Sequence, residues 1–202
     1  PRHADTAIFY SISNAQKGLA GISFGNFLIK RVVDELSREF PRLKTFATLS
    51  PVIGFRGWLE RVLEEGEPGL LTQREHKALK SARPGGAKGT LKALLAESEW
   101  HGDETIASAM RAPLLRLGAR YLIQESHQNG RPLDPVAHFH LSNGARMGNL
   151  NWLADTSDRG MRQAAGLMIN YVYQLDEIED NHEAYTTNGE RVCSSSIRGL
   201  LK

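Results

Sequence analysis

Three neighbouring stretches decide the fold: AIFYSIS (residues 7–13), GISFGNFLIKRVVDELSRE (residues 21–39) and KTFATL (residues 44–49). The first and third mix β-branched, aromatic and hydroxyl side chains, a composition that favours strands. Between them, apolar side chains recur at every fourth position: Phe24, Leu28, Val32 and Leu36. This spacing predicts an amphipathic helix over residues 25–39. Strand, glycine-rich bend, helix and strand make a βαβ unit, in which the strands are normally parallel.

The composition of the 202 residues excludes several classes of protein. Hydrophobic residues make up 41% and charged residues 24%, which is typical of a globular domain. With 25 Lys and Arg against 23 Asp and Glu, the net charge of +2 gives no argument for a nucleic acid or an anionic membrane as partner. Cys193 stands alone and excludes an internal disulfide, and no apolar run approaches the ~20 residues of a membrane span.

The later part of the sequence predicts helices and two further strands. Apolar periodicity predicts helices over four ranges: 55–65, 72–82, 91–98 and 105–125. Pro113 is expected near the start of the last helix. Alternating side chains predict a strand over residues 135–142, and β-branched and aromatic content predicts another over residues 168–175. The residues after Asn181 are expected to form a loop and then a short helix.

A glycine-rich loop, Ala20-Gly21-Ile22-Ser23-Phe24-Gly25-Asn26, joins the first strand to the helix. A helix N-terminus exposes unpaired backbone N–H groups, and glycines let an anion approach them closely, so this loop suits a pyrophosphate. No Gly-Lys-Ser/Thr follows, which excludes a P-loop, and the glycines do not form a G-x-G-x-x-G motif. An ordinary tight turn between strand and helix is the alternative.

Ser50 stands where the second strand ends, because Pro51 fixes the geometry of the residue before it. Ligands of parallel α/β units bind beyond the carboxyl ends of the strands, so we expect Ser50 and the glycine-rich loop at the same edge. No G-x-S-x-G elbow surrounds Ser50, which argues against an α/β-hydrolase nucleophile. A serine that caps a turn is the alternative.

His138 and His140 lie in the strand predicted over residues 135–142, where positions i and i+2 share a face. Two histidines on one face are candidate metal ligands, with Asp155 or Asp158 as a third ligand. A single catalytic histidine beside a structural neighbour is favoured, because imidazole titrates near neutrality and suits proton transfer.

Two charged segments have a functional and a plain interpretation. The loop predicted over residues 83–89 lies within a basic stretch that could meet the phosphates of a nucleotide-like ligand: Lys80, Arg83, Lys88 and Lys92. A solvated loop or a subunit contact explains it as well. The acidic run from Asp176 to Asp180 is interpreted as a solvated face or a helix start.

Long composite motifs resemble the malonyl-CoA decarboxylase family, in order and over nearly the whole chain. They include YSIS (10–13), QKGLAG (16–21), GNFLIKRVV (25–33), TLSP (48–51), FHL (139–141), NGA (143–145) and NWLAD (151–155). The catalytic domain of that family has the GNAT acyltransferase fold, with a separate helical domain ahead of it. The resemblance therefore implies an α/β fold with a mixed sheet flanked by helices. It also implies that residues 1–202 are the C-terminal part of the catalytic domain, and that the helical domain and the first strands are missing from this chain.

Carried over position by position, the resemblance places the CoA pyrophosphate on the loop from Ala20 to Asn26 and the two catalytic positions on Ser50 and His140. His138 matches no catalytic position. The GNAT motif usually begins with Arg or Gln, and its paired glycines correspond here to Ser23 and Gly25. Side-chain help from Ala20 is therefore lost, whereas backbone N–H donation is kept.

The activity that the resemblance implies is decarboxylation of malonyl-CoA to acetyl-CoA and carbon dioxide, a step of fatty acid metabolism. No metal or organic cofactor is expected, because the thioester itself accepts the electrons. Ser50 is expected to hydrogen-bond and orient the malonyl group, and His140 to supply a proton to the enolate carbon. The alternatives are a CoA-dependent N-acyltransferase of the same fold, a CoA-binding module without activity, and a metal hydrolase that uses His138 and His140.

The resemblance also implies partners. A homo-oligomer is expected, with the apolar helical stretches between Leu91 and Leu122 as a candidate interface. Strand 7–13 is expected to be a middle strand of the sheet, so that a preceding segment of the same protein covers it. Pro1 to Asp5 lack the apolar core of a signal peptide, and the terminal Leu200-Leu201-Lys202 is no peroxisomal signal, which makes the cytoplasm the default location.

Overall fold

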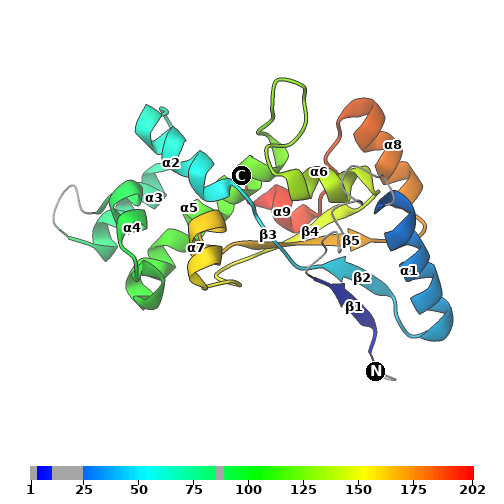
Figure 1. Ribbon diagram of the computed structural model, residues 1–202. Coiled ribbons are helices and arrows are strands. Elements are labelled where there is room, and N and C mark those ends of the chain that lie inside the picture. The colour runs from blue at the N-terminus through cyan, green and yellow to red at the C-terminus, as the bar shows by residue number, and fades with distance from the viewer. Residues whose placement is uncertain (1–3, 11–24, 85–88) are drawn as a thin grey trace.

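A computed structural model describes residues 4–10, 25–84 and 89–202, which form a mixed sheet flanked by helices (Figure 1). The elements are β1 (Thr6–Phe9), α1 (Gly25–Glu39), β2 (Thr45–Thr48), β3 (Ser50–Pro51), α2 (Phe55–Glu65), α3 (Gln73–Ala82), α4 (Leu91–Ala96), the 3-10 turn Trp100–Gly102, α5 (Glu104–Ile123), α6 (Pro135–Ser142), β4 (Arg146–Asn151), α7 (Asp158–Ala164), β5 (Met168–Tyr173), α8 (Ile178–Asn188) and α9 (Ser195–Gly199). Helices α2 to α5 and α7 gather at one end of the sheet, and α1 and α8 lie side by side at the other (Figure 1). The fold class implied by the resemblance is confirmed.

The βαβ unit expected at the start of the sequence is present. β1 pairs with β2 in parallel, with Ile8 opposite Ala47, and α1 covers the predicted range 25–39. β1 ends at Phe9, whereas the prediction ran to Ser13, and residues 11–13 lie outside the described part of the chain. Among the described strands, β1 has β2 as its neighbour on one side only.

Strand β5 organises the rest of the sheet. β2 and β3 follow each other along one edge of β5, with Phe46 opposite Tyr173 and Ser50 opposite Ile169, both antiparallel. β4 lies along the other edge and is also antiparallel. The strand predicted over residues 168–175 is thus confirmed as β5, and among the described strands it alone pairs with three others.

The helices predicted between residues 55 and 125 are confirmed as α2 to α5, but the position of Pro113 was wrong. α5 begins at Glu104, because the Asp103 carboxylate caps it by accepting from the backbone N–H groups of Thr105 and Ile106. Pro113 therefore lies in the middle of α5, where it is buried. A proline there removes one backbone hydrogen bond, and packing on several sides of the helix compensates.

The strand predicted over residues 135–142 is wrong, because this segment is helix α6. Asp134 caps it and Pro135 occupies its first position, a combination that starts helices. Ala137, His140 and Leu141 are buried at helical spacing. Sequence reasoning missed two of the described strands, the two-residue β3 and β4. The composition of β4, RMGNLN, lacks β-branched residues, and it forms a strand because the edge of β5 pairs with it.

The loop predicted directly after Asn181 is wrong, because helix α8 continues to Asn188. The acidic run before residue 181 leads into α8, so its interpretation as a helix start is confirmed, and α9 is the short helix near the end. Within the ranges described above, no helix has both the length and the apolar character needed to cross a lipid bilayer.

Candidate functional site

Ser50 is buried at the point where the chain passes from β2 to β3. The residue is 8% exposed, and its hydroxyl donates a hydrogen bond to Oγ1 of Thr48 at 3.2 Å. Ser50 pairs directly with Ile169 of β5. Paired residues of an antiparallel sheet place their side chains on the same face, so Ser50 shares a face of the sheet with Ile169.

His140 lies in the last turn of α6 and is 2% exposed. Its Nδ1 and the hydroxyl oxygen of Tyr173 form a hydrogen bond of 2.7 Å. Its ring stacks on the ring of Tyr171, with centroids 4.5 Å apart and planes 23° apart. Two aromatic side chains of β5 thus fix the position and the rotation of the imidazole.

Strand β5 brings the two predicted catalytic residues to one face. Ile169, Tyr171 and Tyr173 alternate along the strand and are buried on the same side of it. Ser50 pairs with the first of these residues, and His140 contacts the second and the third. The structure therefore places Ser50 and His140 on the same side of the same strand.

Burial determines the protonation states at this site. It lowers the pKa of His140 to about 4, so the imidazole is neutral at pH 7. It also raises the pKa of Tyr173 well above its ordinary value, so the phenol keeps its proton. One of the two groups donates and the other accepts: if the Tyr173 hydroxyl donates to Nδ1, the ring proton of His140 lies on Nε2.

Asp134 is a buried acid beside this site that sequence reasoning missed. Its Oδ1 caps α6 by accepting from the backbone N–H groups of Val136, at 2.7 Å, and Ala137, at 3.3 Å. Its Oδ2 is buried without a hydrogen-bond partner among the described residues, and so is the hydroxyl of Tyr171. Burial raises the pKa of Asp134 to about 7, against the opposing effect of nearby backbone N–H groups. Burial, and secondly the negative charge of Asp134, raise the pKa of Tyr171.

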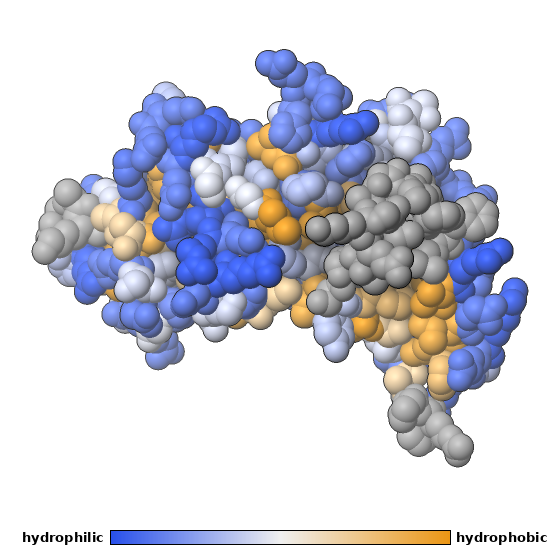
Figure 2. All heavy atoms as spheres, in the orientation of Figure 1, coloured by the Kyte–Doolittle hydropathy of each residue, from blue (hydrophilic) through white to orange (hydrophobic). Residues whose placement is uncertain are grey.

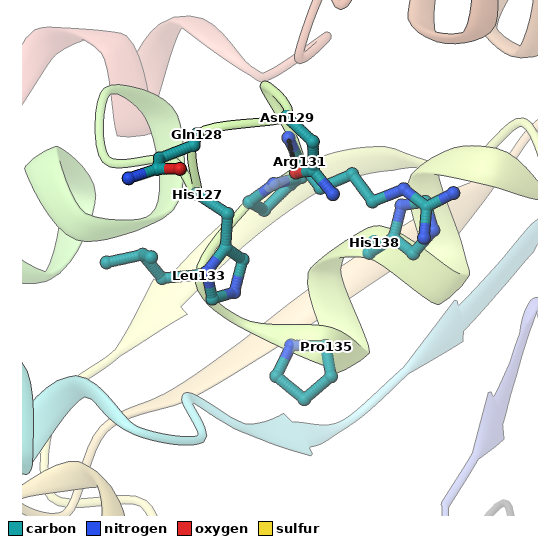
Figure 3. A pocket seen from close by; sticks show the side chains of 8 residues that line it. His127, Gln128, Asn129, Arg131, Leu133, Pro135 and His138 are labelled. Atoms are coloured by element: carbon teal, nitrogen blue, oxygen red, sulfur yellow. Dashed lines mark hydrogen bonds between the residues drawn. The ribbon is translucent and has the colours of Figure 1, made fainter.

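The structure separates His138 from His140. Successive residues of a helix are about 100° apart, so two histidines at i and i+2 of α6 point in different directions, and the shared face expected for a strand is wrong. His138 bonds through Nδ1 to the Tyr185 hydroxyl at 2.6 Å. It lines a surface pocket of about 630 Å³ with His127 and Arg131 (Figure 3). Across the three described ranges, no three His, Cys, Asp or Glu side chains gather where they could hold a metal ion.

The glycine-rich loop lies largely outside the described residues, which include neither Ala20, Gly21, Ile22, Ser23 nor Phe24. Gly25 and Asn26 are the first two residues of α1. α1 connects two parallel strands, so its N-terminus lies on the side of the sheet at which β1 and β2 end, and Ser50 follows β2 directly. The role of the loop in binding a pyrophosphate stays a prediction.

Two described residues of the basic stretch lie beside acidic side chains of this chain. Arg83 pairs with Glu97, and Lys92 lies 3.8 Å from Glu64. Lys80 lies in the last turn of α3, and Lys88 lies outside the described residues. These acidic neighbours favour the interpretation as an ordinary charged surface.

Tyr171, Tyr173 and Thr48 are the other contacts that sequence reasoning missed. The strand containing the two tyrosines was predicted, but nothing in its sequence indicates that a histidine thirty residues earlier lies against it. Asp134 carried a usable signal, because an acidic residue directly before a proline is typical of a helix start. That signal also contradicted the strand prediction for residues 135–142.

Comparisons with known proteins agree with one another. Residues 1–202 match the family described as "Malonyl-CoA decarboxylase C-terminal domain". The mitochondrial malonyl-CoA decarboxylase of Anser anser anser is 45% identical over 185 residues, which cover 89% of this chain and 36% of the relative. The corresponding protein of Rattus norvegicus is 44% identical over 200 residues, which cover 96% of this chain and 40% of the relative.

Solved structures give the same result. The crystal structure of malonyl-CoA decarboxylase from Agrobacterium vitis has a TM-score of 0.85 and 47% identity, covering 100% of this chain and 46% of that chain. The crystal structure of malonyl-CoA decarboxylase from Rhodopseudomonas palustris has a TM-score of 0.81 and 48% identity. The match covers 98% of this chain and 42% of that chain. The chain spans about two fifths of the length of the curated relatives that it matches.

Proposed function

Because the chain belongs to the malonyl-CoA decarboxylase family, matched over residues 1–202, we propose that its site converts malonyl-CoA to acetyl-CoA and carbon dioxide. The observation that carries the proposal is the buried His140 held by Tyr173 on the same sheet face as Ser50. The curated relatives carry this activity in their names but are longer than this chain. Because this chain spans only about two fifths of their length, their activity is proposed for it and not carried over.

The proposed reaction needs neither a metal nor an organic cofactor. When the bond to the β-carboxylate breaks, its electron pair passes into the thioester carbonyl, and carbon dioxide leaves. The product is a thioester enolate, which takes one proton at the α-carbon to give acetyl-CoA. The protein has to orient the carboxylate out of the thioester plane, stabilise the developing oxyanion with fixed donors and deliver the proton.

We assign orientation of the malonyl group to Ser50. A hydroxyl that is held in a sheet and largely buried loses little freedom when it binds, so it can hold one substrate conformation. Its contact with Thr48 Oγ1 fixes the oxygen, and rotation of the hydroxyl directs its proton to a substrate oxygen.

We assign proton delivery to Nε2 of His140. The imidazole is neutral at pH 7, so the donor is its ring N–H, and the Tyr173 hydroxyl keeps that proton on Nε2 by donating to Nδ1. A thioester enolate is a strongly basic carbon, for which a neutral donor suffices. The proton given to the substrate is then replaced from solvent.

CoA itself is proposed to bind through the segment from Ala20 to Asn26, with its pyrophosphate at the N-terminus of α1. This accounts for the near-neutral composition, because backbone N–H groups meet the phosphates without a basic surface. No observation favours the alternative of an N-acyltransferase.

The experiment is an assay of acetyl-CoA and carbon dioxide formation by the whole protein and its variants. We expect Ser50→Ala to lower kcat by about 10²- to 10³-fold and His140→Asn by about 10²- to 10⁴-fold. His138→Gln is the matched control on the same helix, and its activity is expected near wild type. Wild-type kcat in either site variant would refute the assigned role, and acetyl transfer to amines without decarboxylation would establish the alternative activity.

We further propose that β1 is covered in the whole protein by a preceding segment. Ile8 is 46% and Tyr10 is 77% exposed, and apolar surface continues beside β1 and α1 (Figure 2). A homo-oligomer is also proposed, to be tested by light scattering of the whole protein. The location in the cytoplasm stays a sequence-based prediction, whereas the names of the curated relatives place those proteins in mitochondria.

A further inference from the structure

The pairing of β5 with its neighbour is interrupted next to Ser50. Ala47 pairs with Val172 and Ser50 pairs with Ile169, but Thr48 and Leu49, which lie between them, are not paired with β5. The backbone N–H of Leu49 points away from β5 and continues the parallel ladder with β1, donating to the carbonyl of Phe9. The position at which Thr48 faces Tyr171, between these two pairs, is therefore hydrogen-bonded differently from the regular positions on either side.

At this position, side chains make the hydrogen bonds that backbone groups make in a regular ladder. The backbone N–H of Tyr171 donates to Oγ1 of Thr48 at 3.2 Å, and the carbonyl of Thr48 accepts from Nδ2 of Asn170 at 2.7 Å. Asn170 is held in turn, because its Oδ1 accepts from Nδ2 of Asn151 in β4 at 2.9 Å. Thr48 is thus fixed at its hydroxyl and at its carbonyl by two consecutive residues of β5.

The Thr48 hydroxyl also contacts Ser50. Oγ1 accepts from the Ser50 hydroxyl at 3.2 Å while it accepts from the Tyr171 amide. Thr48 is completely buried, and solvent cannot replace either bond. If the bond between the two hydroxyls reverses, so that Thr48 donates to Ser50 Oγ, Oγ1 still accepts from the Tyr171 amide and the Ser50 proton becomes free for substrate.

The contact between Thr48 and Tyr171 also connects Thr48 to His140. Tyr171, whose amide is bound by Thr48, carries the ring on which the imidazole of His140 stacks at 4.5 Å. The Thr48 hydroxyl therefore contacts the Ser50 hydroxyl and also the backbone amide of Tyr171, whose ring supports His140. An unbroken ladder would place the Tyr171 amide against the Thr48 carbonyl and would leave the Thr48 hydroxyl without this role.

We propose that Thr48 is a positioning residue that sets Ser50 relative to His140, through its hydroxyl bonds to Ser50 and to the Tyr171 amide. The inference rests on the proposed function, because it assumes that Ser50 and His140 act on the substrate. It goes beyond that function in assigning a role to a residue that touches neither the substrate nor the reacting atoms.

Thr48→Val tests the proposal, because valine keeps the shape of threonine and removes the hydroxyl. We expect kcat of the whole protein to fall by about 10- to 100-fold, because small misplacements of reacting groups have effects of this size. KM for malonyl-CoA is expected to change less than about twofold, and Thr48→Ser is expected to restore most of kcat. Thr45→Val is the matched control in the same strand, since Thr45 is only partly buried and lies at the far end of β2 from Ser50, and it should behave as wild type.

A double-mutant cycle separates this proposal from the function on which it rests. If Thr48 acts through Ser50, Ser50→Ala with Thr48→Val loses little more activity than Ser50→Ala alone. Wild-type kcat in Thr48→Val, an equal loss in Thr48→Ser or fully additive losses would overturn the role of Thr48. Full activity of Ser50→Ala would instead overturn the proposed function.

If Thr48→Val does not fold, Asn170→Ala carries the test. It removes the support of the Thr48 carbonyl and leaves the hydroxyl in place. We expect a smaller loss of kcat with unchanged KM, and unchanged kcat would count against the proposal.

Discussion

The imidazole of His140 lies between two tyrosines of one strand, stacked on Tyr171 and bonded through Nδ1 to the hydroxyl of Tyr173 at 2.7 Å. Residues at i and i+2 of a strand point to the same face, so β5 supplies both contacts without a turn or a loop. A helix residue held in this way has one ring nitrogen committed to the protein and the other available for chemistry.

The hydroxyl of Tyr173 is expected to matter for catalysis more than for folding. Tyr173→Phe removes the partner of Nδ1 and no longer selects the ring nitrogen that carries the proton. We expect kcat to fall by about 10- to 100-fold, measured as acetyl-CoA formation by the whole protein. Tyr185→Phe removes the equivalent hydroxyl from His138 and serves as the control. Equal effects of the two variants would mean that the Tyr173 contact has no special role.

The neutral state of buried His140 predicts a loss of stability in acid. Burial lowers its pKa to about 4, whereas the histidine of the unfolded chain takes up a proton near 6.5. The unfolded state therefore binds more protons between these values, and the free energy of unfolding falls as the pH drops from 6.5 to 4. The largest effect is about 3 kcal/mol. Urea unfolding of wild type and His140→Asn at pH 7 and pH 4.5 measures it, and the variant should lose less stability on acidification.

The buried Asp134 predicts the opposite pH dependence, a free energy of unfolding that falls as the pH rises. Its pKa is raised to about 7, so the folded state keeps a proton that the unfolded chain has already lost above pH 4. The free energy of unfolding then falls as the pH rises from 4 to 7, by at most about 4 kcal/mol. Asp134→Asn keeps a cap oxygen for α6 and removes the charge, so it should unfold at higher urea than wild type at pH 8 and near the wild-type concentration at pH 4.

The control for Asp134 is the cap of α5. Asp103 makes the same two backbone bonds at an exposed position, to Thr105 and Ile106. Asp103→Asn should give no gain in stability at pH 8. A gain of equal size at both caps would show that burial of the Asp134 carboxylate is not the cause.

The parts of this fold that could be predicted are those with a strong local period. Helix α1 and strand β5 were predicted within two residues, because their apolar faces repeat along the sequence itself. Helix α6 alternates in sequence as a strand would, because its polarity does not follow its burial: the polar His140 is buried against β5, whereas the apolar Val136 and Phe139 are only partly buried. In such a helix the hydrophobic pattern loses its period, and the Asp-Pro start signal is the better guide.

Of the candidate site, the sequence indicated Ser50 and His140 but none of the residues that support them. Ser50 was indicated by its place at the end of a strand and His140 as one of two spaced histidines, and the resemblance assigned both a role. Their supports, Thr48 and Tyr173, depend instead on the register of β2 and β5, which lie 120 or more residues apart in sequence. Register follows from tertiary packing, and no local pattern reports it.

Gly144 ends the helix that carries His140, and its replacement is expected to be costly. Its φ is +77°, and a Cβ atom there would lie 2.1 Å from the carbonyl oxygen of Ile178 at the start of α8. A side chain therefore requires α8 to move away from α6. We expect Gly144→Ala to destabilise the protein by about 3 kcal/mol or more.

Gly130 provides the matched comparison for Gly144. It has a φ of +79°, but a Cβ atom there meets nothing within 4 Å. Gly130→Ala should therefore cost only the left-handed backbone strain, about 1–2 kcal/mol. The difference in free energy of unfolding between the two variants measures the contact between the α6 turn and α8. Equal losses would show that α8 yields without cost, in which case the decarboxylase activity of Gly144→Ala should also be that of wild type.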